Sequence, residues 1–474
     1  MATDKPNVKS PDYEAMAEFW QRVTDIVDGQ DAIIEQGETY LPKLPNESQK
    51  DYEFRLETAK FTNVYRDILE GLAQRPFSHP LTVGEETDTR IRDLVEDIDG
   101  RGNHLHVFAS DTFFEGINKA IDWVLVDFQN VEFDHITSVD DEKKAGVRPY
   151  WVHIPADKVI WVKSKVIQGR EQLTLVRIQE SENRIREYVR EQFKDDDGNI
   201  AWRVVWAVYV ENPKVRGTWD IEDNGVLSID EIPMVPFATG RRKGKSWRFN
   251  PPMSDAADLQ IELYQQESGL KHIKTMSAFP MFSGNGVQPD VGPDGKPKRV
   301  PIGPSAVLYA PPDADGGHGE WTSLSPDADL LRFLAEDVKS TILQLRELGR
   351  QPLTAQSGNL TVVTTMVAAE KGNSAVQEWA LKLKDALESC FRLTALWLGV
   401  ESPTMVTVFT DFGIEDLNDK TPEHLLKMRA AGDLSAERLW DEFKRRGILG
   451  ADFTNEDEIK RLFSELPGGD EPEI

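Results

Sequence analysis

The chain has 474 residues, with 55 Lys and Arg against 82 Asp and Glu, and its formal net charge at pH 7 is −27. This length predicts about two to four domains. The single cysteine, Cys390, excludes an intramolecular disulfide framework and any multi-cysteine zinc or iron–sulfur site, which fits assembly in a reducing compartment. The acidity argues against a protein that grips nucleic acid through clustered cations, although not against one that touches DNA and releases it.

Membrane insertion and export are also not expected. No apolar run approaches the ~20 residues that are needed to span a bilayer. The first six residues, Met-Ala-Thr-Asp-Lys-Pro, lack the apolar core of a signal peptide.

The N-terminal quarter has apolar residues at helical spacing. The pattern predicts a helix over 13–28, one continuous helix from Asn46 to the stop signal Arg75-Pro76, and a third helix over 103–121. From 122 to about 240 the pattern changes to alternation of apolar and polar residues, interrupted by turn signals such as Asp223-Asn-Gly. This region is predicted to be mostly antiparallel β-sheet.

The second half is predicted to contain a helical pair that brackets an insert. Apolar stripes predict helices over 253–276 and 327–349. Between them, 279–326 is rich in Pro and Gly, and we expect a small β insert with strands near 279–282 and 306–309, because structureless loops of this length are unusual.

A polar segment and a long helix come next. The segment 351–361 is polar, and a helix is expected over 362–398 with Cys390 on its apolar face. The C-terminal stretch is expected to hold a strand over 405–409, helices over 422–431, 435–446 and 455–466, and an acidic, disordered tail over 467–474.

A search for catalytic or ligand-binding patterns gives no active site. His104 and His106 have no third ligand at metal-site spacing, so capping or solvated histidines are favoured. The acidic runs that begin at Asp140 and Asp195 lack the donor spacing of a calcium loop. Cys390 is interpreted as a core residue rather than a nucleophile. Neither a phosphate-binding glycine loop nor a Gly-x-Ser-x-Gly elbow is present in the sequence. We therefore expect no enzyme, cofactor or metal site.

One basic run stands out in this acidic chain, between positions 241 and 248. In the functional interpretation, the run contacts phosphates or the carboxylates of a neighbouring subunit. In the other interpretation, it is a turn whose cations are solvated or ion-paired within the chain. Its cations are Arg241, Arg242, Lys243, Lys245 and Arg248.

The order of elements, together with three segments, resembles the portal proteins of tailed bacteriophages over nearly the whole chain. The segments 40–66 and 354–374, and 378–399 with Glu378-Trp-Ala-Leu and Trp397-Leu-Gly, are similar to one portal subgroup that is catalogued only as a domain of unknown function. The resemblance implies an α+β fold. It also implies names for its parts: a wing over 1–250 that is β-rich from about 122, stem helices over 251–278 and 327–350, a clip over 279–326, a tunnel loop and long helix over 351–400, and a wing return, helical crown and acidic tail over 401–474.

The resemblance further implies a function. The protein would form a ring of twelve subunits at one capsid vertex of the virion, after assembly in the host cytoplasm. The ring would be the channel for packaging and ejection of double-stranded DNA, without sequence specificity. Its partners would be the major capsid protein, the terminase large subunit and the head–tail adaptor.

Two groups of residues are candidate contacts within this hypothesis. The polar tunnel loop would touch the DNA backbone in the channel through Gln356, Asn359, Leu360 and Thr361. A basic cluster of the clip, Lys296, Lys298 and Arg299, would touch an acidic surface of terminase or adaptor. The alternative for each group is a solvent-exposed loop or turn that has no binding role.

Two other classes stay open at this stage. A hydrolase or nuclease whose carboxylates meet only in the fold is one alternative, because Asp, Glu and His are plentiful. Another oligomeric virion protein, such as an adaptor or minor capsid protein, is the third hypothesis. Adaptors are usually shorter, and they lack a long helix pair around a β insert.

Overall fold

The computed structural model describes residues 5–128, 148–194, 199–278, 281–285, 319–324, 328–350, 362–410, 412, 421–445, 449, 453–455 and 458–461. The chain forms two compact units, 1–412 and 413–474. The fold is a mixture of helices and antiparallel sheets, so the α+β prediction is confirmed.

Short helices form the N-terminal part. The Ser10 hydroxyl accepts a hydrogen bond from the Tyr13 amide at 3.1 Å, and Pro11 occupies the first turn, so α1 begins where its cap is satisfied. The helical elements of this part, in chain order, are α1 (Pro11–Asp28), α2 (Gln30–Glu35), η1 (Gly37–Thr39), α3 (Gln49–Glu57), α4 (Val64–Ala73), η2 (Arg75–Phe77), α5 (Thr89–Leu94), η3 (Val95–Asp97) and α6 (Leu105–Lys119).

The prediction of one continuous helix from Asn46 to Arg75 is wrong. The helix is divided into α3, which ends at Glu57, and α4, which begins at Val64. Asn63 caps the second part, because its side-chain oxygen accepts a hydrogen bond from the Arg66 amide at 3.0 Å. Helical spacing alone does not reveal this break, because the apolar residues continue through it.

Two antiparallel sheets occupy the predicted β region. A three-stranded sheet has the order β3-β2-β9, and a five-stranded meander has the order β4-β5-β6-β7-β8. The strands are β2 (Ile121–Phe128), β3 (Pro149–Ile154), β4 (Val159–Ile167), β5 (Arg170–Ser181), β6 (Arg184–Lys194), β7 (Ile200–Glu211), β8 (Trp219–Val226) and β9 (Met234–Ala238), with η5 (Ala156–Lys158) before β4. All their pairings are antiparallel, as the alternation predicted.

Three two-stranded pairs complete the described sheet structure. In the first, β1 (Thr82–Val83) pairs with β14 (Val406–Thr407), which lies within the expected strand 405–409. In the second, β10 (Arg241–Arg242) pairs with β11 (Phe249–Asn250). In the third, β12 (Met281–Asn285) pairs with β13 (Glu320–Leu324) inside the Pro/Gly-rich insert. The strand expected near 279–282 is therefore found, shifted toward the C-terminus, whereas 306–309 lies outside the described residues.

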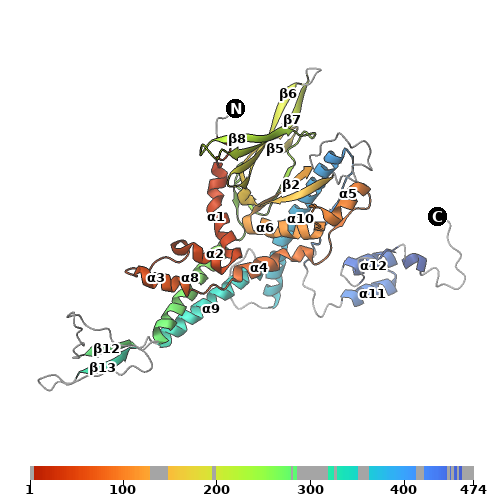
Figure 1. The fold of residues 1–474 in the computed structure, drawn as a ribbon. Helices are drawn as coiled ribbons and strands as arrows, with labels where there is room; N and C mark the ends of the chain where they lie inside the picture. The colour runs from red at the N-terminus through yellow and green to blue at the C-terminus, as the bar shows by residue number, and fades with distance from the viewer. Residues whose placement is uncertain are drawn as a thin grey trace. The chain divides into compact units, whose positions relative to one another are not determined.

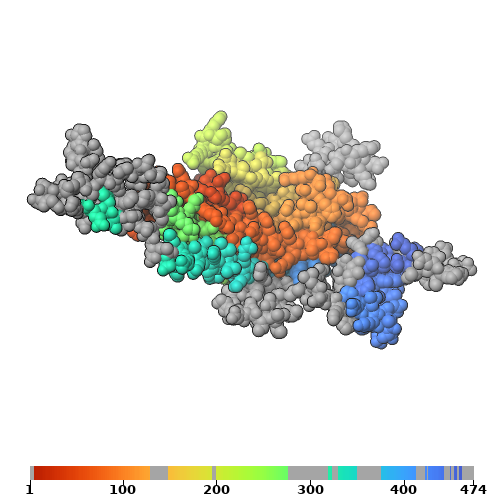
Figure 2. Space-filling view, turned by 90° about the horizontal axis from the view of Figure 1, so that it is seen from below, coloured from red at the N-terminus to blue at the C-terminus, as the bar shows by residue number. Residues whose placement is uncertain are grey.

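The three long helices match their sequence-based bounds closely. They are α8 (Ser254–Ala278), α9 (Ala328–Arg350) and α10 (Val362–Leu398). Helices α8 and α9 run side by side, and α10 packs against the three-stranded sheet (Figure 1). Figure 2 shows the surface of α9 in cyan beside α8 in green and the N-terminal helices in red and orange.

The core consists of two apolar clusters. One joins the N-terminal helices to α8, α9 and α10, and the other fills the space around the two larger sheets. Cys390 of α10 is fully buried in the first cluster, and burial raises the pKa of its thiol. The prediction that Cys390 is a core residue is confirmed.

The second unit contains α11 (Thr421–Ala431) and α12 (Ala436–Arg445). Both agree with the expected helices. Trp440 of α12 makes an edge-to-face contact with Phe453, with ring centroids 5.8 Å apart. Of the helix expected over 455–466, residues 455 and 458–461 are helical, and the acidic tail lies outside the described residues. Across the described part of the chain, no helix is long and apolar enough to cross a membrane.

Candidate functional site

The pair α8 and α9 is joined to the N-terminal helices through polar contacts. We call the region where α8 residues 260–267 and α9 residues 345–349 meet α3 and α4 the hairpin root. Within the pair itself, the Thr341 hydroxyl of α9 donates to the Gln266 side-chain oxygen of α8 at 2.9 Å. The apolar stripe of α9 predicted from sequence faces inward at Val338 and Leu345, which are 9% and 0% exposed.

Gln260 of α8 caps the N-terminus of α4, which is distant from it in the sequence. Its side chain is fully buried, and its oxygen accepts hydrogen bonds from the backbone amides of Val64 and Tyr65 at 3.0 and 2.9 Å. Its nitrogen donates to the carbonyl of Thr62 at 2.9 Å. These two amides belong to the first turn of α4, where backbone donors have no intrahelical partner. Gln260 therefore fixes the point at which α4 begins.

Glu267 lies two turns further along α8 and holds the segment before α4. Its carboxylate accepts hydrogen bonds from the Thr62 amide at 3.0 Å, the Thr62 hydroxyl at 2.8 Å and the Lys60 ammonium at 3.0 Å. The residue is only 6% exposed. A carboxylate at this depth needs such partners. Gln260 and Glu267 together explain why the chain leaves the helical path between α3 and α4.

A buried ion pair stabilises α3 beside α8. Arg55 donates to both carboxylate oxygens of Glu47, from Nε and Nη2 at 2.8 Å each, and Nη2 also donates to the Pro42 carbonyl. The two side chains are 4% and 6% exposed. The hydrogen bond from Arg55 holds the pKa of Glu47 well below its usual range, at about 2.

Close backbone packing joins α9 to α4. A Cβ atom at Gly349 would lie 2.6 Å from Cγ2 of Ile68, a separation that no carbon pair tolerates without a shift. Glycine at this position therefore allows the end of α9 to approach α4.

Most sequence-predicted contact residues lie outside the described residues. This applies to the tunnel-loop residues Gln356, Asn359, Leu360 and Thr361 and to the clip residues Lys296, Lys298 and Arg299, which stay predictions.

The basic run from 241 to 248 is described, and it forms β10, a turn and β11. Arg242 makes a two-pronged ion pair with Glu171 at 2.8 and 2.9 Å and lies over the Trp247 ring. Arg248 contacts Asp12 at 3.3 Å. The ion-paired turn thus describes two of the five cations. The others, Arg241, Lys243 and Lys245, are exposed, and their contact with phosphate or a neighbouring subunit stays a prediction.

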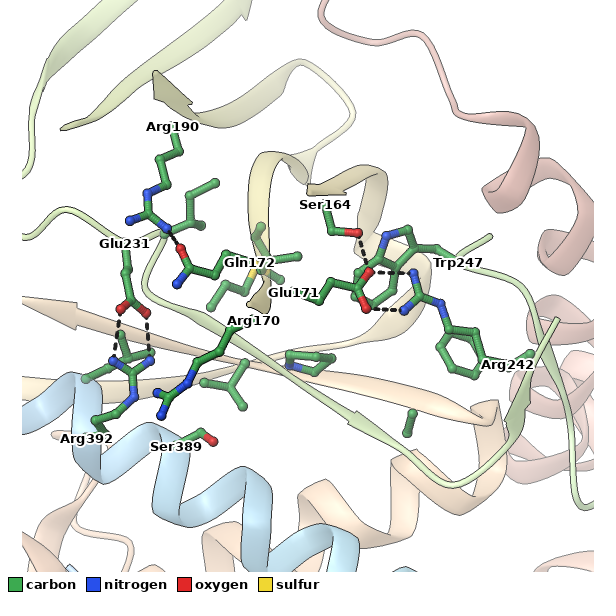
Figure 3. A pocket seen from close by; sticks show the side chains of 18 residues that line it. Ser164, Arg170, Glu171, Gln172, Arg190, Glu231, Arg242, Trp247, Ser389 and Arg392 are labelled. Atoms are coloured by element: carbon green, nitrogen blue, oxygen red, sulfur yellow. Dashed lines mark hydrogen bonds and ion pairs between the residues drawn. The ribbon is translucent and has the colours of Figure 1, made fainter. Parts of the chain in front are cut away.

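Arg242 and Trp247 also line a cavity of about 390 Å³ between the two larger sheets and α10 (Figure 3). Arg392 of α10 lies on the opposite side and makes a two-pronged ion pair with Glu231 at 3.1 and 2.7 Å. Arg190 of β6 is buried, with a side chain that is 3% exposed, and it donates to Gln172 and to Asp230. Arg170, at the start of β5, points toward the α10 side of the cavity (Figure 3).

Sequence reasoning missed this cavity. Arg170 and Arg190 lie on the consecutive strands β5 and β6, but Arg392 belongs to α10, about 200 residues further along the chain, and no local pattern links it to them. Two local signals lie near the cavity in the sequence, the basic run that contains Arg242 and the turn residue Gly169 before β5. Gln168 and Gly169 both have positive φ values of 50° and 78°, as in a tight hairpin, and this turn places Arg170 at the cavity edge.

The histidine candidates are described, whereas the acidic runs that begin at Asp140 and Asp195 lie outside the described residues. The His104 side chain accepts from the His106 amide at 3.0 Å at the start of α6, so the capping interpretation is confirmed for His104. Asp122 is fully buried beside His153, and burial raises the pKa of its carboxyl to about 6. Among the described residues, no group of three or more His, Cys, Asp and Glu side chains could hold a metal ion.

One protein family matches part of the chain. The family is described as a domain of unknown function, DUF4055, and the match covers residues 252–398. This range runs from the start of α8 to the end of α10. The match agrees with the expected resemblance to a subgroup catalogued as a domain of unknown function. No curated protein sequence matches the chain.

Two solved structures are similar to the chain at low identity. One is a chain of the "Neck of native GTA particle computed with C12 symmetry", with 12% identity, a TM-score of 0.40, and coverage of 82% of this chain and 90% of that chain. The other belongs to the "Neck of empty GTA particle computed with C6 symmetry", with 13% identity, a TM-score of 0.41, and coverage of 83% and 91%.

Proposed function

We propose that the chain is a portal protein of a tailed bacteriophage, a structural head-to-tail connector that forms a ring of twelve subunits around double-stranded DNA. One observation supports this above the others. Two long helices run side by side, bracket a β-hairpin, and are followed by a third long helix on a sheet. This order matches the stem, clip, stem and tunnel-helix order that the sequence resemblance implies.

The proposal assigns a role to each part of the chain. Residues 1–250 would be the wing, 251–278 and 327–350 the stem, and 279–326 the clip. Residues 351–400 would contain the tunnel loop and the long helix, and 401–474 would form the wing return, crown and acidic tail. The hairpin root supports this division, because buried polar contacts to the wing helices would fix the direction in which the stem leaves the wing.

The surface of α9 supports assembly into a ring. Leu330, Phe333 and Leu343 are 50%, 64% and 61% exposed on a helix that is otherwise packed against α8. Large apolar side chains that remain exposed on one element favour a protein–protein contact. In the proposed ring, the stem helices of neighbouring subunits would cover them.

The net charge of −27 suits a channel that does not hold its contents. Carboxylates that line a lumen would repel phosphates, and the DNA would be free to slide. A basic lumen would instead bind DNA through release of counterions. The tunnel loop would contact the DNA backbone only through uncharged residues, so no ion pair would hold the DNA. These residues are Gln356, Asn359, Leu360 and Thr361.

The clip would be the docking site for other proteins. We propose that Lys296, Lys298 and Arg299 contact an acidic surface of the terminase large subunit during packaging and of the head–tail adaptor afterwards, while the wing contacts the major capsid protein. Charge reversal at the three positions should weaken capture of terminase or adaptor, with the ring intact. Unchanged capture would remove this assignment.

Electron microscopy of the purified full chain tests the proposed architecture. The expected image is a large ring with an axial hole. Metal-dependent nuclease activity, lost on substitution of one specific carboxylate, would instead favour an enzyme.

A further inference from the structure

The arginine-lined cavity contains more positive than negative charge. Four arginines and two glutamates line it: Arg170, Arg190, Arg242, Arg392, Glu171 and Glu231. Asp230, outside the lining, is bonded to Arg190, and one positive charge still remains in excess. This excess occurs in a chain whose overall charge is strongly negative. A concave site with unbalanced arginines favours an anionic occupant.

Two of the arginines have unused hydrogen-bonding capacity. The guanidinium of Arg170 makes no hydrogen bond or ion pair with any residue that the structure describes, and Figure 3 shows it directed toward α10. Arg190 is almost completely buried, yet its Nε has no partner among the described residues. Unsatisfied buried donors are uncommon in folded proteins, and each one calls for an explanation. A ligand in the cavity would supply that explanation.

The lining indicates what kind of anion fits. Planar guanidinium groups bind carboxylates and phosphates through paired hydrogen bonds, and the cavity already contains two such pairs, Arg242–Glu171 and Arg392–Glu231. Ile232, Met234 and Leu393 add apolar side chains to the lining. An acidic side chain carried on a peptide would match both features.

A second copy of the chain is the source that the charges favour. Copies that each carry a charge of −27 repel one another, so a ring needs local contacts between opposite charges to offset this repulsion. The chain has 82 acidic residues that could enter such a contact. Since Arg170 and Arg392 are both exposed at the cavity, another copy would have access to them.

We propose that this cavity is the docking site for a carboxylate-bearing segment of a second copy of the chain, held by Arg170 and Arg392 with Arg190 behind them. The inference rests on the proposed ring. It adds a specific contact between subunits, away from the stem and clip.

Charge reversal with a matched control tests the proposal. The full chain would be studied by native mass spectrometry as wild type, Arg170→Glu and Lys165→Glu. Lys165 is exposed on β4 of the same hairpin, pairs in register with Gln172 and does not line the cavity. Both substitutions change the net charge by the same amount. We expect Lys165→Glu to assemble like the wild type, and Arg170→Glu to lose the ring peak at a concentration where the wild type is fully assembled.

The outcomes separate this inference from the proposed function. A wild type that never forms a ring overturns both. A wild-type ring with an equally stable Arg170→Glu ring overturns the cavity contact alone. If circular dichroism shows that Arg170→Glu is misfolded, Arg170→Gln, which only removes the charge, takes its place with the same expected loss.

Cross-linking tests the occupant directly. A photo-reactive residue at Ser389 in a ring mixed from isotope-labelled and unlabelled copies should attach to an Asp- or Glu-containing peptide of another copy. Cross-links confined to single copies would contradict the proposal.

Discussion

Gln260 and Glu267 at the hairpin root differ from Arg170 and Arg190 at the arginine-lined cavity in how completely their polar side chains are paired. At the root, Gln260 and Glu267 use their side-chain oxygens within the chain, on amides, a hydroxyl and an ammonium. In the cavity, Arg170 has no partner in the described residues and the buried Nε of Arg190 has none either.

This difference separates structure from binding. Polar groups that are fully satisfied inside the chain stabilise the fold, and their removal leaves partners buried without hydrogen bonds. Polar groups that keep unused capacity contribute little to folding and remain available to a ligand. The root should therefore be sensitive to substitution in unfolding experiments, whereas the cavity should be sensitive in assembly experiments.

The largest effect on folding is expected at the buried ion pair beside the root. Arg55→Met would leave Glu47 buried without its partner, and loss of one member of such a pair costs about 3–5 kcal/mol of unfolding free energy. Urea unfolding at one fixed protein concentration measures it. Arg203→Met is the control, because Arg203 and Glu191 form an exposed pair, 43% and 36% accessible, worth about 0–1 kcal/mol. If both variants lost the same unfolding free energy, burial would not explain the contribution of the Arg55–Glu47 pair.

A smaller loss is expected for the cap that α8 provides. Gln260→Leu would leave the Tyr65 amide without an acceptor and the Val64 amide with only the Thr62 carbonyl, and a buried unsatisfied group costs about 1–3 kcal/mol. Gln344→Leu makes the same change on the exposed side of α9 and should be nearly neutral. Hydrogen exchange should also show faster exchange at the start of α4 in Gln260→Leu only. Unchanged protection there would refute the capping role.

Two glycines in the paired helices should respond in opposite directions to the same substitution. Gly349→Ala would force a Cβ against Ile68, and overpacking of this kind costs about 1–3 kcal/mol. Gly269→Ala of α8 meets nothing within 4 Å, so the higher helix propensity of alanine should stabilise the fold by about 0.5–1 kcal/mol. Thermal unfolding of both variants provides the measurement. A stabilised Gly349→Ala would mean that α9 does not approach α4 closely.

The smallest effect on folding is expected in the cavity. Arg170→Gln removes a charge that has no partner in the described residues, so the unfolding free energy should change by less than about 0.5 kcal/mol. The unfolding free energy should be measured at a protein concentration too low for assembly, because assembly itself stabilises the folded chain. A loss as large as that of Gln260→Leu would place Arg170 among the structural residues and remove the contrast between the two regions.

The sequence predicted those parts of the fold that depend on local periodicity. The bounds of α8, α9 and α10 follow from apolar stripes, and the antiparallel sheets follow from alternation and turns. The break between α3 and α4 could not be predicted in the same way. The groups that decide it, Gln260 and Glu267, lie about 200 residues further along the chain.

The same limitation explains why the cavity was missed. Arg242 was noticed because it belongs to a dense basic run, but its partner Glu171 is 71 residues away in the sequence. Arg190 and Arg392 are single cations within a β-strand and a helix. Periodicity places each of them on its element and carries no information about which distant elements will meet.

The mass of the assembled particle, measured on the intact chain under native conditions, tests the central claim most directly. One chain has a mass of 53.6 kDa. The proposed connector predicts a closed ring at twelve times this mass, stable on dilution. A protein that stays at the mass of one chain across concentrations and salt would contradict it.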